Sequence, residues 1–266
     1  MRDLRLSEIW IYPIKSLSGI RLQKAHVLPK GLEHDRRWML VDEHNRFITQ
    51  REHPELALFQ VEISNGQLTI LHRANQESVQ FSINTHSTDI ETVTIWDDQV
   101  QASEVDQTIS KWFSDQLKMK CRLMFFPETN SRPVDAAYAI KNDQVSLADG
   151  YPFLIIGQSS LDDLNKRLQD PITMQRFRPN FVFTGGEPYE EDHWKNFTIG
   201  EVRFIGVKNC SRCVLTTVDP KTGIKGKEPL QTLSTYRKRN NKIYFGQNLV
   251  ASDFGIIQAG DIIYQS

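Results

Sequence analysis

The feature that most constrains the fold is a series of short apolar runs, separated by turns, that fills the first part of the chain. These runs are rich in β-branched and aromatic side chains, which favour strands. Asn65-Gly66 separates two of them, and this dipeptide is a strong signal for a tight hairpin; Asp97-Asp98 divides a second pair in the same way. The predicted strands span residues 6–12, 37–42, 46–50, 58–64, 67–71 and 92–96. This half of the chain therefore predicts an antiparallel barrel or sandwich.

A change in the spacing of the apolar residues marks the end of this region. Between residues 104 and 118, apolar side chains recur at helical spacing along one face. They are Val105, Ile109, Trp112, Phe113 and Leu117. A further strand is expected at 121–126, before a turn-rich stretch at 127–132. We place the division between two domains here, with residues 1–120 in the first and 121–266 in the second.

The second half mixes helices and strands. Ser159-Ser160 is expected to cap one helix and Glu228-Pro229 to open another. The apolar residues expected on these two helices are Leu161, Leu164 and Leu168, and Leu230, Leu233 and Tyr236. Strands are expected at 181–184, 202–207, 214–218 and 243–245. The whole chain is thus predicted to be mainly β with several helices, an α+β fold.

Composition limits the partners. The 266 residues contain 32 basic and 33 acidic side chains, for a formal net charge of −1. No overall charge therefore draws the chain to nucleic acid or to an anionic membrane. The apolar runs are far shorter than the roughly 20 residues of a membrane-spanning helix, and the charged N-terminus lacks the apolar core of a secretory signal. We expect a cytoplasmic protein that binds neither nucleic acid nor membrane.

The cysteines offer the first chemical signal. Cys121, Cys210 and Cys213 are too few for a disulfide framework. The last two form a C-x-x-C pair, but a zinc site would need more ligands, and His193 has no partner at ligand spacing. A thioredoxin-like site would need a helix after the motif, where residues 214–218 predict a strand. Two packed thiols remain one interpretation. The other is a thiolate, favoured by the charge of Arg212, that is the single protein ligand of a soft metal.

The C-x-x-C segment is one of a set of motifs spread along nearly the whole chain. They occupy residues 12–16 (YPIKS), 35–38 (DRRW), 152–154 (PFL), 177–180 (FRPN), 210–220, 222–223, 227–230 (KEPL), 236–237 and 245–248 (FGQN). In this order they resemble the MOSC-domain proteins, named for the C-terminal region of molybdenum-cofactor sulfurases. The resemblance is closest to the branch that contains the mitochondrial amidoxime-reducing component and its bacterial relatives. It implies an N-terminal MOSC-type β-barrel domain followed by a MOSC β-barrel domain.

The resemblance also implies a molybdenum cofactor, Mo-molybdopterin, bound between the two domains. Cys213 matches the family's thiolate ligand to molybdenum, so it is the expected metal ligand and catalytic residue, while the pterin dithiolene and oxo groups complete the coordination. The positions that match cofactor contacts are Lys15, Ser16, Arg36, Gly150, Tyr151, Arg178, Asn180, Ser211 and Arg212. Gly150 and Tyr151 align with two small hydroxylated residues in the mitochondrial protein and so depart from it. The guanidinium and ammonium groups suit the cofactor's phosphate.

Two further residues receive roles beside this set. Asp149 is a second catalytic candidate, near the metal and able to move protons; a turn or cap aspartate is the equal alternative. Cys210 is expected to be a packed thiol.

By resemblance, the reaction is the two-electron reduction of N-hydroxylated small molecules such as amidoximes, hydroxylamines and N-hydroxylated base analogues. The chain lacks the cysteine spacing of a fused plant-type ferredoxin and any G-x-G-x-x-G after a strand. A separate ferredoxin, flavoprotein or cytochrome is therefore expected to supply electrons. Pyridoxal phosphate, which general descriptions of the family mention, is not expected because the sulfurase half that binds it is absent. The alternatives are a non-catalytic carrier of the cofactor or its sulfur, and a metal-free redox pair of Cys210 and Cys213.

Overall fold

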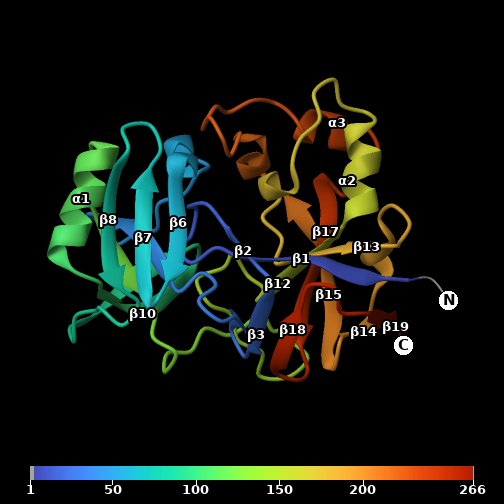
Figure 1. The fold of residues 1–266 in the computed structure, drawn as a ribbon, viewed down its shortest axis with the longest axis horizontal. Helices are drawn as coiled ribbons and strands as arrows, with labels where there is room; N and C mark the ends of the chain where they lie inside the picture. Colours follow the sequence, from blue (N-terminus) through green and yellow to red (C-terminus); the bar gives the residue numbers. More distant parts are fainter. Residues whose placement is uncertain (1–2, 266) are drawn as a thin grey trace.

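The computed structural model describes residues 3–265, which form two lobes side by side (Figure 1). The N-lobe, on the left in Figure 1, is built from residues 38–125. It contains η1 (Pro54–Leu58), α1 (Gln107–Leu117) and the strands β5 (Trp38–Asp42), β6 (Phe59–Ser64), β7 (Gln67–His72), β8 (Glu77–Ser82), β9 (Ile90–Ile95), β10 (Asp98–Glu104) and β11 (Cys121–Phe125).

The N-lobe is a pair of open antiparallel sheets. One has the strand order β5-β11-β10-β9 and the other β6-β7-β8. Trp38 of β5 and Phe59 of β6 meet in one buried cluster between them, and burying each such side chain contributes about 1.5–3 kcal/mol. Asn65 and Gly66 both have positive φ, 50° and 71°, as a two-residue type I′ hairpin between β6 and β7 requires. The predicted hairpin is confirmed. Of the predicted alternatives, barrel or sandwich, the described strands pair as a sandwich.

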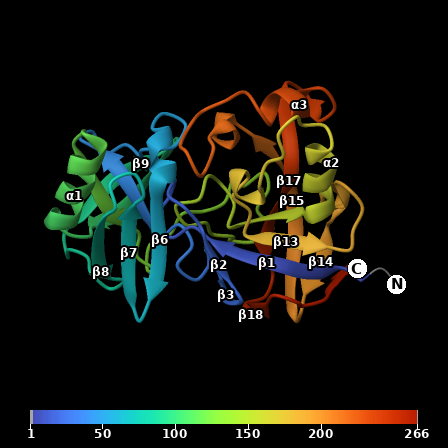
Figure 2. The ribbon, with the colours of Figure 1, turned by 45° about the horizontal axis from the view of Figure 1, so that its top comes forward.

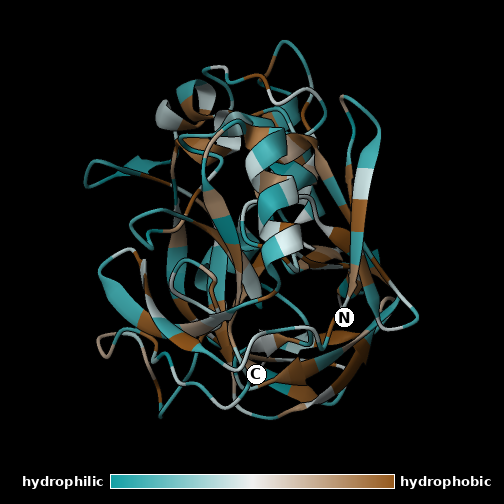
Figure 3. Cartoon of the chain, turned by 90° about the vertical axis from the view of Figure 1, so that its left-hand side faces the viewer, coloured by the Kyte–Doolittle hydropathy of each residue, from teal (hydrophilic) through white to brown (hydrophobic). Residues whose placement is uncertain are grey.

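The predicted helix at residues 104–118 is confirmed as α1. Its N-cap, Asp106, accepts hydrogen bonds from the backbone N–H groups of Thr108 and Ile109, and it ends at Lys118 in the left-handed conformation. Ile109 and Phe113 are buried against the sheet. In Figure 3, which looks at this end of the molecule, most of the outward surface of the helix is hydrophilic. The helix is therefore amphipathic, with one face packed on the N-lobe.

The C-lobe is dominated by a nine-stranded sheet in the order β19-β14-β15-β17-β12-β13-β1-β2, with β16 paired to β17 (Figure 2). These strands are β1 (Arg5–Ile11), β2 (Ile20–Leu22), β12 (Phe153–Gly157), β13 (Phe181–Thr184), β14 (Asn196–Ile199), β15 (Val202–Arg212), β16 (Lys238–Arg239), β17 (Lys242–Ala251) and β19 (Ile263–Gln265). A smaller sheet contains β3 (Lys24–Leu28), β4 (Gly31–Leu32) and β18 (Gly255–Gln258). The helices are α2 (Gln158–Asn165), α3 (Leu230–Ser234), η2 (Met174–Arg176), η3 (Glu190–His193) and η4 (Val214–Thr217).

The central strands of the large sheet are buried on both faces. In β12, Phe153 and Ile155 belong to one buried cluster, while Leu154 and Ile156 belong to another that includes Leu161 of α2. Successive side chains of a strand point to opposite faces, so a strand covered on both sides is apolar throughout. This explains the unbroken apolar run at 153–156. Together with the N-lobe sheets, it confirms a mainly β fold with a few helices.

Strand pairing links the two halves of the chain. β1 lies beside β13 in the large sheet, although the two strands are more than 160 residues apart. Conversely, β11 pairs with β5 and β10 in the N-lobe. The division at residue 120 stays a prediction about sequence segments, and the sheets exchange strands across it.

Two predicted strands are wrong. Residues 46–50 contain only isolated bridges, at Arg46 and Phe47. Residues 214–217 form η4, a 3-10 helix, because the hydroxyls of Thr216 and Thr217 donate to backbone carbonyls three residues earlier, at 3.0 and 2.8 Å. The predicted helices are also shorter than expected, since Leu168 lies beyond α2 and Tyr236 beyond α3. Within residues 3–265, none of the helices has the length and apolar character needed to cross a bilayer.

Candidate functional site

A cavity of about 280 Å³ lies between the lobes and is lined by all eleven residues predicted for the site. Its wall is made by loops at the ends of central strands. The loop after β1 brings Lys15 and Ser16, and the segment before β5 brings Arg36. Residues 149–151 precede β12, Arg178 and Asn180 precede β13, and residues 211–213 lie where β15 gives way to η4. The structure therefore gathers the predicted residues in one place, while the role of each stays a prediction.

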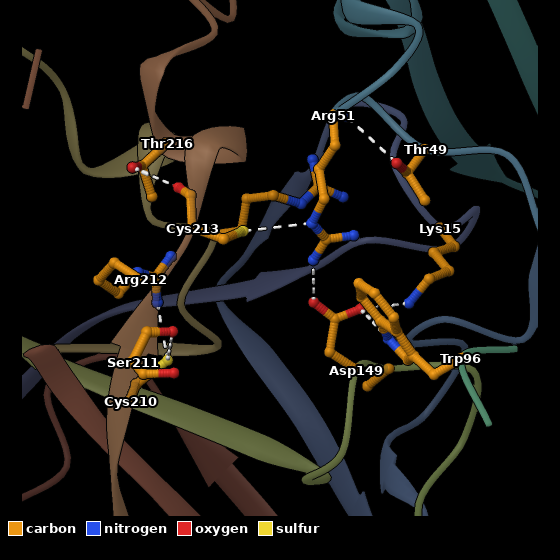
Figure 4. Close-up of polar contacts among 12 residues, drawn as sticks. Lys15, Thr49, Arg51, Trp96, Asp149, Cys210, Ser211, Arg212, Cys213 and Thr216 are labelled. Atoms are coloured by element: carbon orange, nitrogen blue, oxygen red, sulfur yellow. Dashed lines mark hydrogen bonds and ion pairs between the residues drawn. The ribbon is translucent and has the colours of Figure 1, made fainter. Parts of the chain in front are cut away.

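The two C-x-x-C sulfurs have different surroundings (Figure 4). Cys213 is exposed, and its Sγ accepts a hydrogen bond from Nε of Arg51 at 3.2 Å. Cys210 is partly buried, packs against the cluster beneath α3, and accepts from Nη1 of Arg212 at 2.9 Å. Residues 210 and 212 are two apart on β15, so they share a face. Arg212 thus contacts Cys210, and the guanidinium that contacts the Cys213 sulfur is that of Arg51.

Arg51 connects Cys213 to Asp149 and Lys15. Its Nη2 donates to Oδ2 of Asp149 at 2.6 Å, while Nζ of Lys15 donates to Oδ1 of the same carboxylate at 2.6 Å. The guanidinium also stacks on Trp96, 4.5 Å from the ring centroid, and the Trp96 indole donates to Asp149 at 3.3 Å. Figure 4 shows these side chains converging on the Asp149 carboxylate. The result is a continuous polar chain from the N-lobe to the cysteine.

Burial and ion pairing both shift the pKa values of Asp149 and Lys15. Burial alone would raise the pKa of Asp149, but Lys15 and Arg51 outweigh it and hold that pKa well below its usual range. Burial lowers the pKa of Lys15 to about 8, although Asp149 acts in the opposite direction. Asp149 is thus a carboxylate at neutral pH, and Lys15 is a cation close to its titration range.

A second group of cations surrounds Tyr12. Arg36 and Arg178 lie over the Tyr12 ring, at 4.3 and 4.2 Å from its centroid. Burial and the neighbouring Arg36 lower the pKa of Arg178 to about 10. Ser16, Arg36 and Arg178 have positive φ values of 69°, 51° and 55°, a conformation that non-glycine residues seldom adopt and that tends to gather at functional sites. Three of the predicted contacts thus occupy strained backbone positions.

Asn180 supports the site from behind. Its Oδ1 accepts from the Leu154 N–H at 3.2 Å and from Arg36 at 3.3 Å, and its Nδ2 donates to the Trp10 carbonyl and to Asp35, both at 3.1 Å. The side chain is 2% exposed. Although Asn180 lines the cavity, its amide is occupied within the protein, so it connects β1, β12 and the Arg36 loop.

Comparison with known proteins agrees with this arrangement. Residues 3–120 match the MOSC N-terminal beta barrel domain, and residues 142–264 match the MOSC domain. Mitochondrial amidoxime-reducing component 1 of Mus musculus is 35% identical over 278 residues, which cover 97% of this chain and 81% of that protein. The Homo sapiens protein of the same name is 34% identical over 277 residues, covering 97% and 82%. The chain belongs to the MOSC-domain family.

The same comparison includes a protein with a different name. The molybdenum cofactor sulfurase of Oryza sativa subsp. japonica is 30% identical over 264 residues, which cover 92% of this chain but 32% of the sulfurase. The relatives of this MOSC protein are thus named for amidoxime reduction and for the molybdenum cofactor.

The cavity of this MOSC protein fits an anionic cofactor that brings most of its own metal ligands. Six basic side chains line it, against one acidic side chain, Asp149, and this excess of positive charge suits a phosphate group. Nε of Arg212 is buried without a hydrogen-bond partner among residues 3–265, as a donor awaiting a ligand would be. No group of three or more His, Cys, Asp or Glu side chains in the described part of the chain is placed to hold a metal. A metal at Cys213 would therefore take its remaining ligands from a cofactor.

Sequence reasoning missed several residues of the cavity. Arg51 is the most important, since it contacts the cysteine sulfur, yet it lies in no recognised motif. Lys208, Asn209 and Asn248 also line the cavity. Asn248 ends the motif at 245–248, which was a signal for it, whereas Arg51 could only be found from the three-dimensional structure.

Proposed function

We propose that this protein is a molybdenum-cofactor-dependent reductase of N-hydroxylated small molecules. The observation that supports this most is the exposed Cys213 sulfur at a cavity lined by six basic side chains. In the reaction, an N–OH compound accepts two electrons and two protons, the N–O bond breaks, and the amine or amidine and water are released. When bound, the cofactor would supply the two-electron redox centre for this reduction.

The basic residues of the cavity would hold the cofactor. Lys15, Arg36, Arg178 and Arg212 would offset the charge of its phosphate and pterin end, with hydrogen bonds from Ser16 and Ser211. Their positions support this role, because all of these residues line the same cavity between the lobes. Gly150 and Tyr151 would form the part of the wall between Asp149 and β12. A Cβ added to Gly150 would meet nothing within 4 Å, so the backbone there is open to a ligand.

Arg51 and Asp149 would act on the metal ligand from the N-lobe side. Arg51 donates to the Cys213 sulfur, and Asp149 anchors Arg51 through the 2.6 Å contact. Because Lys15 and Arg51 keep Asp149 ionised and hold its pKa well below the usual range, this carboxylate would neither deliver a proton at neutral pH nor readily accept one. We therefore keep Asp149 beside the reacting centre as the anchor of Arg51.

The electrons would come from a separate electron-transfer protein, a ferredoxin, flavoprotein or cytochrome. The sulfurase relative favours a second candidate function, in which the chain is a non-catalytic carrier of the cofactor or its sulfur. Both candidates need Cys213 and the cationic cavity, but only the enzyme turns over substrate.

The test combines metal analysis with turnover. Protein produced in a host that makes the cofactor should contain about one molybdenum per chain and should reduce benzamidoxime with reduced methyl viologen as donor. A carrier would bind molybdenum without turnover, and a metal-free cysteine pair would bind none. Cys213→Ser should abolish turnover because it removes the thiolate proposed to bind the metal. Cys210→Ser is the matched control, because Cys210 lies within β15, and this variant should keep most of the turnover. Equal losses from both substitutions would contradict the ligand assignment.

A further inference from the structure

One segment of the C-lobe differs sharply in charge from the rest of the molecule. Residues 221–242 carry seven basic side chains and one acidic side chain, in a chain whose formal net charge is −1. Six of the seven are exposed. They lie in two arms, a loop before α3 and a hairpin after it, which we call the basic arc. The exposed residues of the arc are Lys221, Lys225 and Lys227 in the loop and Lys238, Arg239 and Lys242 in the hairpin.

Little within the protein neutralises this charge. Among residues 3–265, no ion pair involves Lys221, Lys227, Lys238 or Lys242. The acidic side chain of the segment, Glu228, accepts from Thr232, and the nearby Asp219 pairs with Arg176 at 2.9 Å. Asp192 pairs with Arg237 and, at 3.9 Å, with Arg239. The backbone of η1 at Pro54 and Glu55 lies against the loop at Gly223.

Both arms adjoin the cysteine end of the cavity. Nζ of Lys225 donates to the backbone carbonyl of Arg51 at 3.2 Å, and the Arg51 side chain contacts the Cys213 sulfur. On the other side, Ile243, next to Lys242, pairs with Arg212, the neighbour of Cys213. α3 lies between the arms and packs on η4 and β17. In Figures 1 and 2 the loop leading into α3 reaches from the C-lobe toward the N-lobe.

Exposed apolar side chains occupy the same region. Val214, which follows Cys213, is 43% exposed, and Ile224, in the loop of the arc, is 69% exposed. An apolar centre with a charged rim is the usual anatomy of a protein interface, and a one-signed rim speeds the encounter with a partner of opposite charge. Neither residue has a role in the cavity, since Val214 and Ile224 are outside its lining.

We propose that the basic arc is the docking surface for an electron-transfer protein with an acidic face. This inference rests on the proposed function, because only a reductase without its own electron source needs such a partner. The arc would bring the donor to the rim of the cavity beside Cys213, so the donor's redox group would face the end where the metal is expected. Charge complementarity would set the rate of association and the choice of partner.

The test uses an acidic plant-type ferredoxin as the probe, with the full-length protein carrying its cofactor. One residue from each arm is reversed in the variant Lys227→Glu/Lys242→Glu. The matched control is Lys118→Glu/Lys120→Glu, at the far end of α1, where both lysines are exposed. We expect ferredoxin to bind the wild type in a salt-dependent manner. The arc variant should lower the association rate about tenfold at low salt, and the control should leave it unchanged.

A second measurement separates this proposal from the proposed function. Benzamidoxime turnover driven by reduced ferredoxin should fall about tenfold in the arc variant, while turnover driven by reduced methyl viologen should be unchanged. Absence of viologen-driven turnover in the wild type would reject the reductase and not the surface. The docking proposal is overturned if ferredoxin binding is independent of salt or absent, if both double variants behave alike, or if vesicles of phosphatidylserine and phosphatidylcholine bind the wild type more tightly than ferredoxin does.

Discussion

The side chain of Asn180 should be worth several kilocalories per mole to the fold even without any cofactor. The family resemblance predicts that Asn180 contacts the cofactor, but its side chain is 2% exposed and makes four hydrogen bonds inside the protein. Replacing it by Leu, which has a similar volume and no polar atoms, removes all four. The Leu154 N–H and the Trp10 carbonyl each lose a partner, and Asp35 loses a donor.

The size of the effect follows from these losses. A buried polar group left without its partner costs about 1–3 kcal/mol. Two of the four contacts, those from Leu154 and Arg36, are long at 3.2 and 3.3 Å, and Arg36 keeps its 2.7 Å bond to Asp35. We therefore expect Asn180→Leu to lower the free energy of unfolding by about 3 kcal/mol. In a domain of this size that corresponds to a loss of about 6–12 °C in Tm.

The assay is chemical and thermal unfolding of cofactor-free protein. The matched control is Asn248→Leu, which changes the same residue type in the same cavity at a side chain for which no hydrogen bond is described within residues 3–265. The control should change the free energy of unfolding by less than about 1 kcal/mol. If the two variants are equally stable, Asn180 does not clamp β1 to β12, and its place in the cavity would have to be explained by ligand binding alone.

Three further changes have defined outcomes. Arg51→Leu should lower kcat for benzamidoxime about tenfold or more, because the Cys213 sulfur and Asp149 both lose the hydrogen bond from Arg51. Arg51→Lys should have an intermediate kcat. Steady-state kinetics with reduced methyl viologen measure this, and full activity of the Leu variant would refute it. Sulfate binding to cofactor-free protein, followed by calorimetry, should weaken between pH 7 and 9 as Lys15 loses its proton near pH 8, and Lys15→Met should remove that pH dependence. The pKa of Lys15 is about 8 in the folded protein and 10.5 in the unfolded chain, so between these pH values the unfolded chain binds more protons than the folded protein. Lys15 therefore makes the free energy of unfolding rise with pH in that window. The Lys15→Met variant should show a smaller rise. Asp106→Ala should cost about 1 kcal/mol in urea unfolding because α1 loses its N-cap, and no change would show that the cap hydrogen bonds are not formed.

Local signals in the sequence were reliable where chemistry and pattern agreed. The Asn65-Gly66 turn and the apolar face of α1 were predictable because a hairpin needs positive φ and a packed helix needs one apolar face. Residues 214–217 show where the pattern failed. Their β-branched side chains favour a strand, but two threonine hydroxyls bond back to the chain and close a 3-10 turn.

The candidate site was predictable only as far as motifs mark it. The predicted residues meet in one cavity, yet the cation that contacts Cys213 is Arg51, 162 positions away, and not its neighbour Arg212. Strand alternation explains the difference, since Arg212 shares a face of β15 with Cys210. Sequence proximity therefore predicted a basic environment for the cysteine pair, while the contact between Arg51 and the Cys213 sulfur follows only from the fold.

The exchange of strands between the lobes explains why such a distant residue reaches the cysteine. β1 is bonded into the large sheet of the C-lobe, and the chain after it carries Lys15 to the cavity before entering the N-lobe. The N-lobe then presents Arg51 toward the same opening, and Asp149, on the return to the C-lobe, bonds both Lys15 and Arg51. The two crossings between the lobes thus bring Lys15 and Asp149 to the cavity, and the Asp149 carboxylate joins Lys15 to Arg51. Because Arg51 of the N-lobe is bonded both to Asp149 and to the Cys213 sulfur, its position over Cys213 is held by the same side chains that line the cavity.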